Sequence, residues 1–185
     1  ALKPEVALGL DLAVERYLAD GGVLSANLFH RRIADLIRNV VALEDVSWSP
    51  GQPRFVSRPQ NIGRAWSQGI ELEAKFRLDQ LVGDGPRTEV RANASLLRSK
   101  VDAIPGPANR IAEQPGRTVN LGADHRFRGT PFTIGANWNH TPGYRTRLDA
   151  DRAIVQSEKN AVDAFVLCGR SSRPRACRGD RGRHR

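Results

Sequence analysis

The chain has 185 residues, of which 39% are hydrophobic and 26% charged, and its formal net charge is +9. This composition excludes a disordered chain. No run of 18 apolar residues occurs, which excludes a transmembrane helix but leaves transmembrane strands open. Residues 168–185 carry seven arginines and one aspartate, so the positive charge lies mainly at one end and does not indicate specific nucleic-acid binding.

Alternation of apolar and polar residues along the chain predicts long β-strands. The first runs from Val6 to Leu18 and is followed by the turn sequence Ala19-Asp20-Gly21-Gly22. The second begins at Val23, but its phase slips near residues 29–32, which a β-bulge would explain. A short helix over 33–40 is the competing interpretation.

Later segments repeat the pattern. Residues 42–61 contain three prolines and are expected to be irregular. Further strands are predicted at 62–78, 87–96, 119–127 and 132–139, with a possible seventh at 161–167.

The connections alternate in length. Short turns fall near 19–22, 79–86 and 128–130, and long connections near 39–61, 101–116 and 142–160. Short turns at one end and long loops at the other are typical of transmembrane β-barrels, whose strands need about 9–11 residues. Six aromatic residues support this, with three beside the short turns and three toward the long loops: Phe76, Phe127, Phe132, Trp66, Trp138 and Tyr144. The predicted fold class is therefore all-β, an antiparallel up-and-down meander of six or seven strands forming part of a transmembrane β-barrel.

Two sequence motifs carry a family resemblance. Asn61-Ile62-Gly63-Arg64-Ala65 is followed by Gly69-Ile70-Glu71-Leu72-Glu73, and a later Pro115 precedes Asn120-Leu121-Gly122. In this order they resemble the C-terminal barrel region of TonB-dependent outer-membrane receptors, over about residues 2–167.

The resemblance implies an active importer in the outer membrane of a Gram-negative bacterium, which takes up a scarce ligand such as a ferric siderophore. Such receptors contact outer-membrane lipid, and a plug domain couples them to TonB. We expect residues 1–167 to be a partial barrel segment and 168–185 to be an arginine-rich tail, disordered or produced by a shifted reading frame. Because no methionine or signal peptide precedes the first strand, we expect a piece of a longer polypeptide.

The candidate site residues form two groups. One group is expected on a charged lumen wall: Glu71, Glu73, Lys75, Arg91 and Asp124. The other is expected in outward loops, where it could attract an anionic ferric chelate or bind lipopolysaccharide phosphates: Arg54, Arg58, Arg110, Tyr144 and Arg145.

No enzyme, cofactor or metal site is predicted. No nucleophile–base set accompanies the carboxylates, and the four histidines lack metal-ligand spacing. A passive porin-like barrel and a soluble β-sandwich binding module stay open as alternatives.

Overall fold

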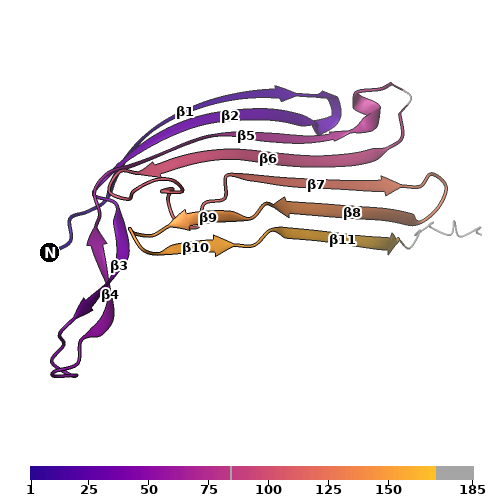
Figure 1. The fold of residues 1–185 in the computed structure, drawn as a ribbon. Helices are drawn as coiled ribbons and strands as arrows, with labels where there is room; N and C mark the ends of the chain where they lie inside the picture. Colours follow the sequence, from indigo (N-terminus) through magenta and orange to yellow (C-terminus); the bar gives the residue numbers. More distant parts are fainter. Residues whose placement is uncertain (84, 170–185) are drawn as a thin grey trace, which may run out of the picture.

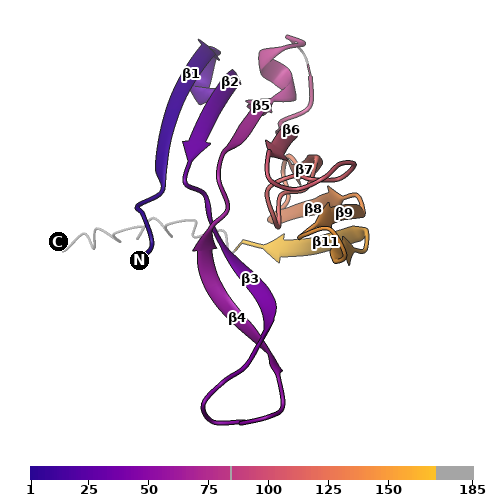
Figure 2. The same ribbon diagram turned by 60° about the vertical axis from the view of Figure 1, so that its left-hand side comes forward.

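A computed structural model describes residues 1–83 and 85–169 of the chain. Seven strands form one antiparallel sheet, and they lie in it in the order β1 (Val6–Tyr17), β2 (Val23–Ala34), β5 (Ala65–Arg77), β6 (Thr88–Val101), β7 (Arg117–Arg126), β8 (Phe132–Thr141) and β11 (Lys159–Cys168). Two smaller hairpins are formed by β3 (Ile37–Glu44) with β4 (Arg54–Asn61) and by β9 (Tyr144–Arg147) with β10 (Ala153–Gln156). The predicted all-β meander is confirmed, and Figure 2 shows its strands following an arc.

The pairing register gives the sheet two chemically different faces. Leu28 of β2 lies opposite Leu12 of β1 and Ile70 of β5, and Ile70 lies opposite Leu96 of β6. Because side chains two apart share a face, the alternating leucines, valines and alanines form one continuous surface, here called the apolar face. The opposite surface, here called the polar face, carries the charged and amide side chains.

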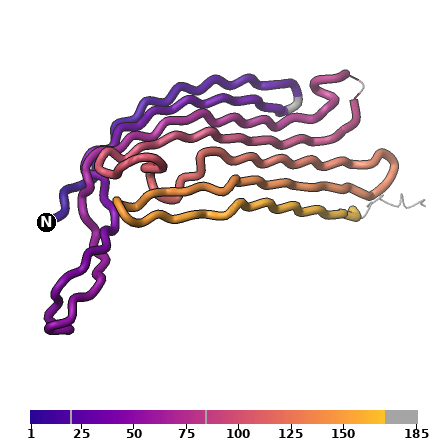
Figure 3. Tube along the Cα trace, viewed as in Figure 1, coloured from indigo at the N-terminus to yellow at the C-terminus, as the bar shows by residue number. Residues whose placement is uncertain are grey.

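The connections are sorted by length between the two ends of the sheet (Figure 1). One end, here called the turn end, has the 3-10 helices η1 (Ala19–Gly21) and η2 (Leu78–Gln80) and the turn between β7 and β8. The other end, here called the loop end, has the segments 35–64, 102–116 and 142–158. This is the predicted alternation of short and long connections, and Figure 3 follows the chain through it.

Residues 35–64 differ from the prediction. Strands β3 and β4 occupy 42–44 and 54–61 of the segment expected to be irregular, and their hairpin projects away from the sheet (Figure 2). The alternative helix over 33–40 is wrong, because β2 and β3 cover most of those residues. No bulge explains the change of phase either, since β1 pairs with β2 without interruption from Val6 to Tyr17. The strand keeps its phase, with Phe29 on the polar face and His30 and Arg32 on the apolar face. The chain then leaves β2 at Asp35, whose φ of 53° is left-handed.

The last strand of the sheet agrees more closely with the sequence prediction. The possible seventh strand is β11, which starts at Lys159 and continues to Cys168, an exposed free cysteine. The polar stretch before it contains the short β9–β10 hairpin. Of the arginine-rich tail predicted at 168–185, residues 170–185 lie outside the described residues.

The buried hydrophobic residues of the described chain lie at the loop end. Leu36, Ala65, Val101 and Ile104 form a small buried cluster. The apolar face is open by contrast, with Leu8 75% and Val162 72% exposed. Among the described residues no second sheet packs on this face, unlike in a β-sandwich. The described segments contain no helix of the length and apolarity that crossing a membrane requires.

Candidate functional site

The five residues predicted for the lumen wall share the polar face. The register of β5, β6 and β7 places all of them there: Glu71, Glu73, Lys75, Arg91 and Asp124. They come from three neighbouring strands, so one sheet surface collects charges that are up to 53 residues apart in the sequence.

Opposite charges alternate across this surface. Arg91 Nη2 lies 2.7 Å from Asp124 Oδ2, and Arg91 Nη1 lies 3.2 Å from Glu89 Oε1. Lys75 Nζ is 3.9 Å from the same Glu89 oxygen. On the next strands, Asn27 Nδ2 donates a hydrogen bond of 3.3 Å to Glu71 Oε2. Such a paired, hydrated surface suits the polar interior of a barrel.

The loop that connects β6 to β7 folds over the loop end of the polar face. Gln114 Nε2 donates to Ser67 Oγ at 3.1 Å, and the backbone N–H of Ile111 donates to Ser99 Oγ at 3.0 Å. Ser67 and Ser99 lie opposite each other on β5 and β6. Asn109 closes the loop itself, since its Nδ2 donates to the carbonyl oxygen of Ile104 at 2.9 Å. Residues 102–116 are therefore a packed segment rather than a loop directed only outward.

Three of the five predicted ligand-contacting residues meet at one hollow. Its volume is about 1080 Å³, and Arg110, Tyr144 and Arg145 contribute to its lining. The strand residues that line it include several from the apolar face: Leu10, Leu28, His30, Gln68, Ile70 and Leu96. Phe29, Gly69 and Leu97, which the register places on the polar face, also line it. The hollow is therefore lined by residues of both strand faces and by loop residues, and Glu71, Glu73 and Lys75 are not among them.

The other two predicted ligand contacts lie in the β3–β4 hairpin. Arg54 Nε donates to Ser49 Oγ at 2.9 Å, and its Nη2 donates to Gln52 Oε1 at 3.1 Å. Arg58 Nε donates to Glu44 Oε2 at 3.0 Å. Both side chains are engaged within their own hairpin and are absent from the lining of the hollow.

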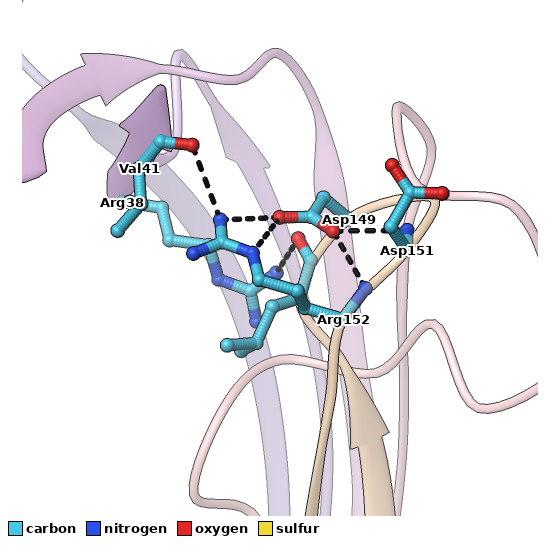
Figure 4. Close-up of polar contacts among 6 residues, drawn as sticks. Arg38, Val41, Asp149, Asp151 and Arg152 are labelled. Atoms are coloured by element: carbon cyan, nitrogen blue, oxygen red, sulfur yellow. Dashed lines mark hydrogen bonds and ion pairs between the residues drawn. The ribbon is translucent and has the colours of Figure 1, made fainter. Parts of the chain in front are cut away.

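A polar cluster that the sequence analysis missed ties this hairpin to the loop after β9 (Figure 4). Arg38 Nη1 donates to the carbonyl oxygen of Leu148 at 3.3 Å, and Arg152 Nη2 donates to that of Val41 at 3.4 Å. Asp149 holds Arg152 in place by accepting from its Nε at 2.6 Å. Contacts 110 residues apart leave no local pattern in the sequence.

Charge and burial shift two pKa values in this cluster. The hydrogen bond from Arg152 is the largest cause that lowers the pKa of Asp149, and backbone N–H donors of Asp151 and Arg152 add to it. Burial lowers the pKa of Arg38. The carboxylate of Asp149 is therefore the stabilising form.

The residues of the first sequence motif have structural roles at the loop end. Asn61 Nδ2 donates to the carbonyl oxygens of Asp35 and Lys3, at 2.7 Å and 2.9 Å, and its Oδ1 accepts from the N–H of Lys3 at 2.8 Å. Gly63 has a φ of +102°, which glycine adopts without steric cost. Ala65 is in the buried cluster. This motif therefore holds the segment before β1 and the exit of β2 against the end of β4.

Among residues 1–83 and 85–169, no group of three or more His, Cys, Asp or Glu side chains is arranged to hold a metal ion. The functional features of the described residues are thus two sheet faces and a set of packed loops.

Comparisons with known proteins give concordant results. A family model described as "TonB dependent receptor-like, beta-barrel" matches residues 1–167. The heme/hemopexin utilization protein C of Haemophilus influenzae (strain 86-028NP) is 25% identical over 160 residues, which cover 83% of this chain and 21% of that protein. The crystal structure of the siderophore receptor PirA from Acinetobacter baumannii has a similar fold, with a TM-score of 0.59 and 14% identity over 89% of this chain and 26% of that one. The chain therefore spans about a fifth to a quarter of the length of these relatives.

Proposed function

Because the chain belongs to the TonB-dependent receptor β-barrel family, we propose that it forms part of the wall of an outer-membrane receptor that imports a scarce ligand. Members of this family are transporters rather than enzymes. The proposal assigns residues 1–167 to the barrel wall, with the apolar face toward lipid and the polar face toward the lumen.

The observation that carries this proposal is the two-faced sheet. Barrel strands that span a membrane alternate between a lipid-facing apolar side and a lumen-facing polar side, with short turns at the periplasmic end. In this chain both features occur together over seven paired strands. A water-soluble sheet has no physical need for an exposed apolar face of this extent.

The transport mechanism follows from the placement of the charges. Loop cations attract an anionic ligand, and the polar face offers a hydrated path along Glu71, Glu73, Lys75, Arg91 and Asp124. Most of these charges are paired with charges of opposite sign. The path therefore offers hydrogen-bonding groups to a ligand without a strong positive or negative electrostatic potential. In the proposed receptor, a plug domain coupled to TonB gates this path and the proton gradient drives its opening.

We propose an iron-bearing small molecule as the ligand class, with a ferric siderophore as the first candidate. Haem is the second candidate, favoured by the similarity to a haem utilisation protein. Both are anionic in common forms, which suits loop residues such as Arg110 and Arg145. We further propose that Arg54, Arg58 and Tyr144 contribute to capture from the surrounding loops.

The first experiment addresses the receptor itself. The DNA that flanks the coding region is sequenced and translated in all three forward frames. A plug domain upstream and further barrel strands downstream support the proposal. A frame with its own start just before Ala1 and a stop just after Arg185 contradicts it.

The second experiment separates active import from passive diffusion. The complete receptor is expressed in cells lacking their own iron receptors, and uptake of radiolabelled iron is measured from a ferric siderophore and from haem. Uptake that stops in a host without TonB supports active import. Uptake that continues there indicates a passive pore.

Variants locate the ligand contacts. Replacing Arg110 and Arg145 with glutamine is expected to raise the ligand concentration for half-maximal uptake about tenfold or more, because each removes a charge-assisted hydrogen bond. Arg126→Gln at the turn end is the matched control and should leave uptake unchanged. Equal receptor levels in the membrane are verified by surface labelling.

A further inference from the structure

Two of the segments at the loop end contribute to the same hollow. Segment 102–116 supplies Arg110 to its lining, and segment 142–158 supplies Tyr144 and Arg145. The two segments belong to different connections, from β6 to β7 and from β8 to β11, and in the described part of the chain no strand pairing joins them. Their relative position therefore depends on contacts between the loops.

One residue, Arg147 of β9, makes the hydrogen bonds that join the two segments. Figure 1 shows β9 beside the loop that follows β6, and the backbone N–H of Arg147 donates to the carbonyl oxygen of Ala108 in that loop at 2.8 Å. Arg147 Nη1 donates to the carbonyl oxygens of Gly106 at 3.1 Å and of Pro105 at 3.3 Å. Among the described residues, Arg147 donates every hydrogen bond between the two segments.

Each segment is also fixed by contacts that do not involve Arg147. The first is held on the polar face by its hydrogen bonds to Ser67 and Ser99. The second is tied to the β3–β4 hairpin, because the carbonyl oxygen of Leu148 accepts a hydrogen bond from Arg38. Loss of the Arg147 side chain should therefore leave both segments folded and release only the distance between them.

The contacts of Arg147 differ from those expected of a ligand-binding arginine. Arg147 is partly buried and is absent from the lining of the hollow, whereas Arg145 on the same strand is exposed and lines it. No carboxylate among the described residues lies within ion-pairing distance of Arg147, and its side chain donates to neutral carbonyl oxygens. Hydrogen bonds from a charged donor are stronger than those between neutral groups. Arg147 is thus suited to holding two loops together.

We infer that Arg147 is a positioning residue for the ligand site. By holding segment 102–116 against β9, it fixes the separation of Arg110 and Arg145, so that both guanidinium groups reach one anionic ligand. A site arranged in advance binds more tightly, because the ligand does not have to order the loops. The inference rests on the proposed function, which places ligand capture at this hollow, and it adds the residue that sets the geometry of the site.

The first test measures uptake of iron by the complete receptor, from a ferric siderophore and from haem. Arg147→Gln removes the guanidinium and keeps the backbone N–H. It is expected to raise the ligand concentration for half-maximal uptake about tenfold, because fewer receptors hold the binding-competent arrangement, and to leave the maximal rate unchanged. Arg126→Gln at the turn end is the matched control and should change neither quantity. A wild-type half-maximal concentration in Arg147→Gln would overturn the inference.

A double-mutant cycle separates positioning from direct contact with the ligand. In a receptor that already carries Arg110→Gln and Arg145→Gln, the groups that Arg147 positions are missing. Adding Arg147→Gln to that receptor should therefore change the half-maximal concentration less than about twofold. A further rise of about tenfold would show that Arg147 contacts the ligand independently, and it would overturn the positioning role.

A structural measurement tests the same link without a ligand. Spin labels replace Glu113 and Ala150, which are exposed and lie one on each segment, in the full 185-residue chain in detergent micelles. Both native cysteines are replaced by serine. The distribution of distances between the labels should be narrow in the wild type and in Arg126→Gln, and broad in Arg147→Gln. Equal distributions in all three chains would overturn the inference.

The two measurements also separate this inference from the proposed function. A wild-type receptor that imports neither iron source would contradict the proposed function, whatever the distances between the labels. Import by the wild type, with the same half-maximal concentration and the same label distances in Arg147→Gln, would overturn the role of Arg147 alone.

Discussion

The guanidinium of Arg91 lies 2.7 Å from the carboxylate of Asp124, across the β6–β7 pair and on the polar face of the sheet. Asp124 is the more shielded of the two, with 21% of its side chain exposed against 38% for Arg91. The same guanidinium also contacts Glu89, so Arg91 links two carboxylates on neighbouring strands.

Replacing Arg91 with methionine is expected to lower the free energy of unfolding by about 1 kcal/mol, because Asp124 loses its ion pair and Glu89 keeps only Lys75 in a partly hydrated setting. Urea unfolding of the chain in detergent micelles measures this. A double-mutant cycle with Asp124→Asn should give a coupling of about 0.5–1 kcal/mol. A coupling of zero would show that Arg91 and Asp124 lie close together without stabilising the fold.

Gly69 in β5 is expected to reject a larger side chain. A Cβ there would lie 2.6 Å from the carbonyl oxygen of Leu96 and 2.9 Å from Cε1 of Phe29. Gly69→Ala should therefore cost about 1–3 kcal/mol of stability. Gly9→Ala is the control, since its nearest neighbour is the exposed side chain of Arg31 at 3.3 Å. Similar unfolding midpoints for both variants would contradict the close packing of β5 against β6.

Asn61 is expected to be essential for ordering the loop end. Asn61→Ala removes three hydrogen bonds that join Lys3 and Asp35 to β4, and should cost about 1–3 kcal/mol. Its exposed neighbour Gln60 makes a suitable control, because Gln60→Ala should stay within about 0.5 kcal/mol of the wild type. Hydrogen exchange of residues 1–6 reports the local effect, and unchanged protection in Asn61→Ala would refute the assigned role.

The link between the β3–β4 hairpin and the loop after β9 should depend on pH. The pKa of Asp149 is lowered in the folded chain, chiefly by its hydrogen bond from Arg152. Its stabilising effect is therefore complete above the ordinary value of 3.8 and is lost as the pH falls through the lowered pKa.

Distances between spin labels on the hairpin and on this loop measure that dependence. We expect the distance distribution to broaden only below about pH 4, near the ordinary aspartate pKa. Asp149→Asn should show the broad distribution at every pH. A wild-type distribution that stays narrow through pH 2 would exclude Asp149 as the controlling group.

The sequence predicted the large sheet because its strands alternate on a period of two over ten residues or more. It missed β3 and β4 for physical reasons. Pro59 and the charged Arg54 and Arg58 lie in β4. Among the described residues this strand pairs only with β3, and none of its residues is buried, so no buried face imposes alternation. The apparent change of phase at 29–32 arises because Phe29 lies on the polar face while His30 and Arg32 lie on the apolar face of an uninterrupted β2.

The sequence predicted which site residues share a strand face, but it did not predict which loop residues come together. The five residues expected on a lumen wall share one face, because strand periodicity alone determines the face, and their position in a lumen stays a prediction. The grouping of Arg110 with Tyr144 and Arg145, and the cluster of Arg38 with Leu148, depend on loop folding between distant segments. Their roles in binding a ligand stay predictions.

The most direct test of the account is the orientation of β5 in a lipid bilayer. In a chain with Cys168 and Cys177 replaced by serine, single cysteines at positions 70–76 are spin-labelled, and collisions with oxygen and with a water-soluble nickel chelate are measured. We predict an alternation of period two, with oxygen favoured at 70, 72, 74 and 76 and the nickel chelate favoured at 71, 73 and 75. Equal access of the nickel chelate to all seven positions would contradict a lipid-facing apolar side and with it the barrel-wall assignment.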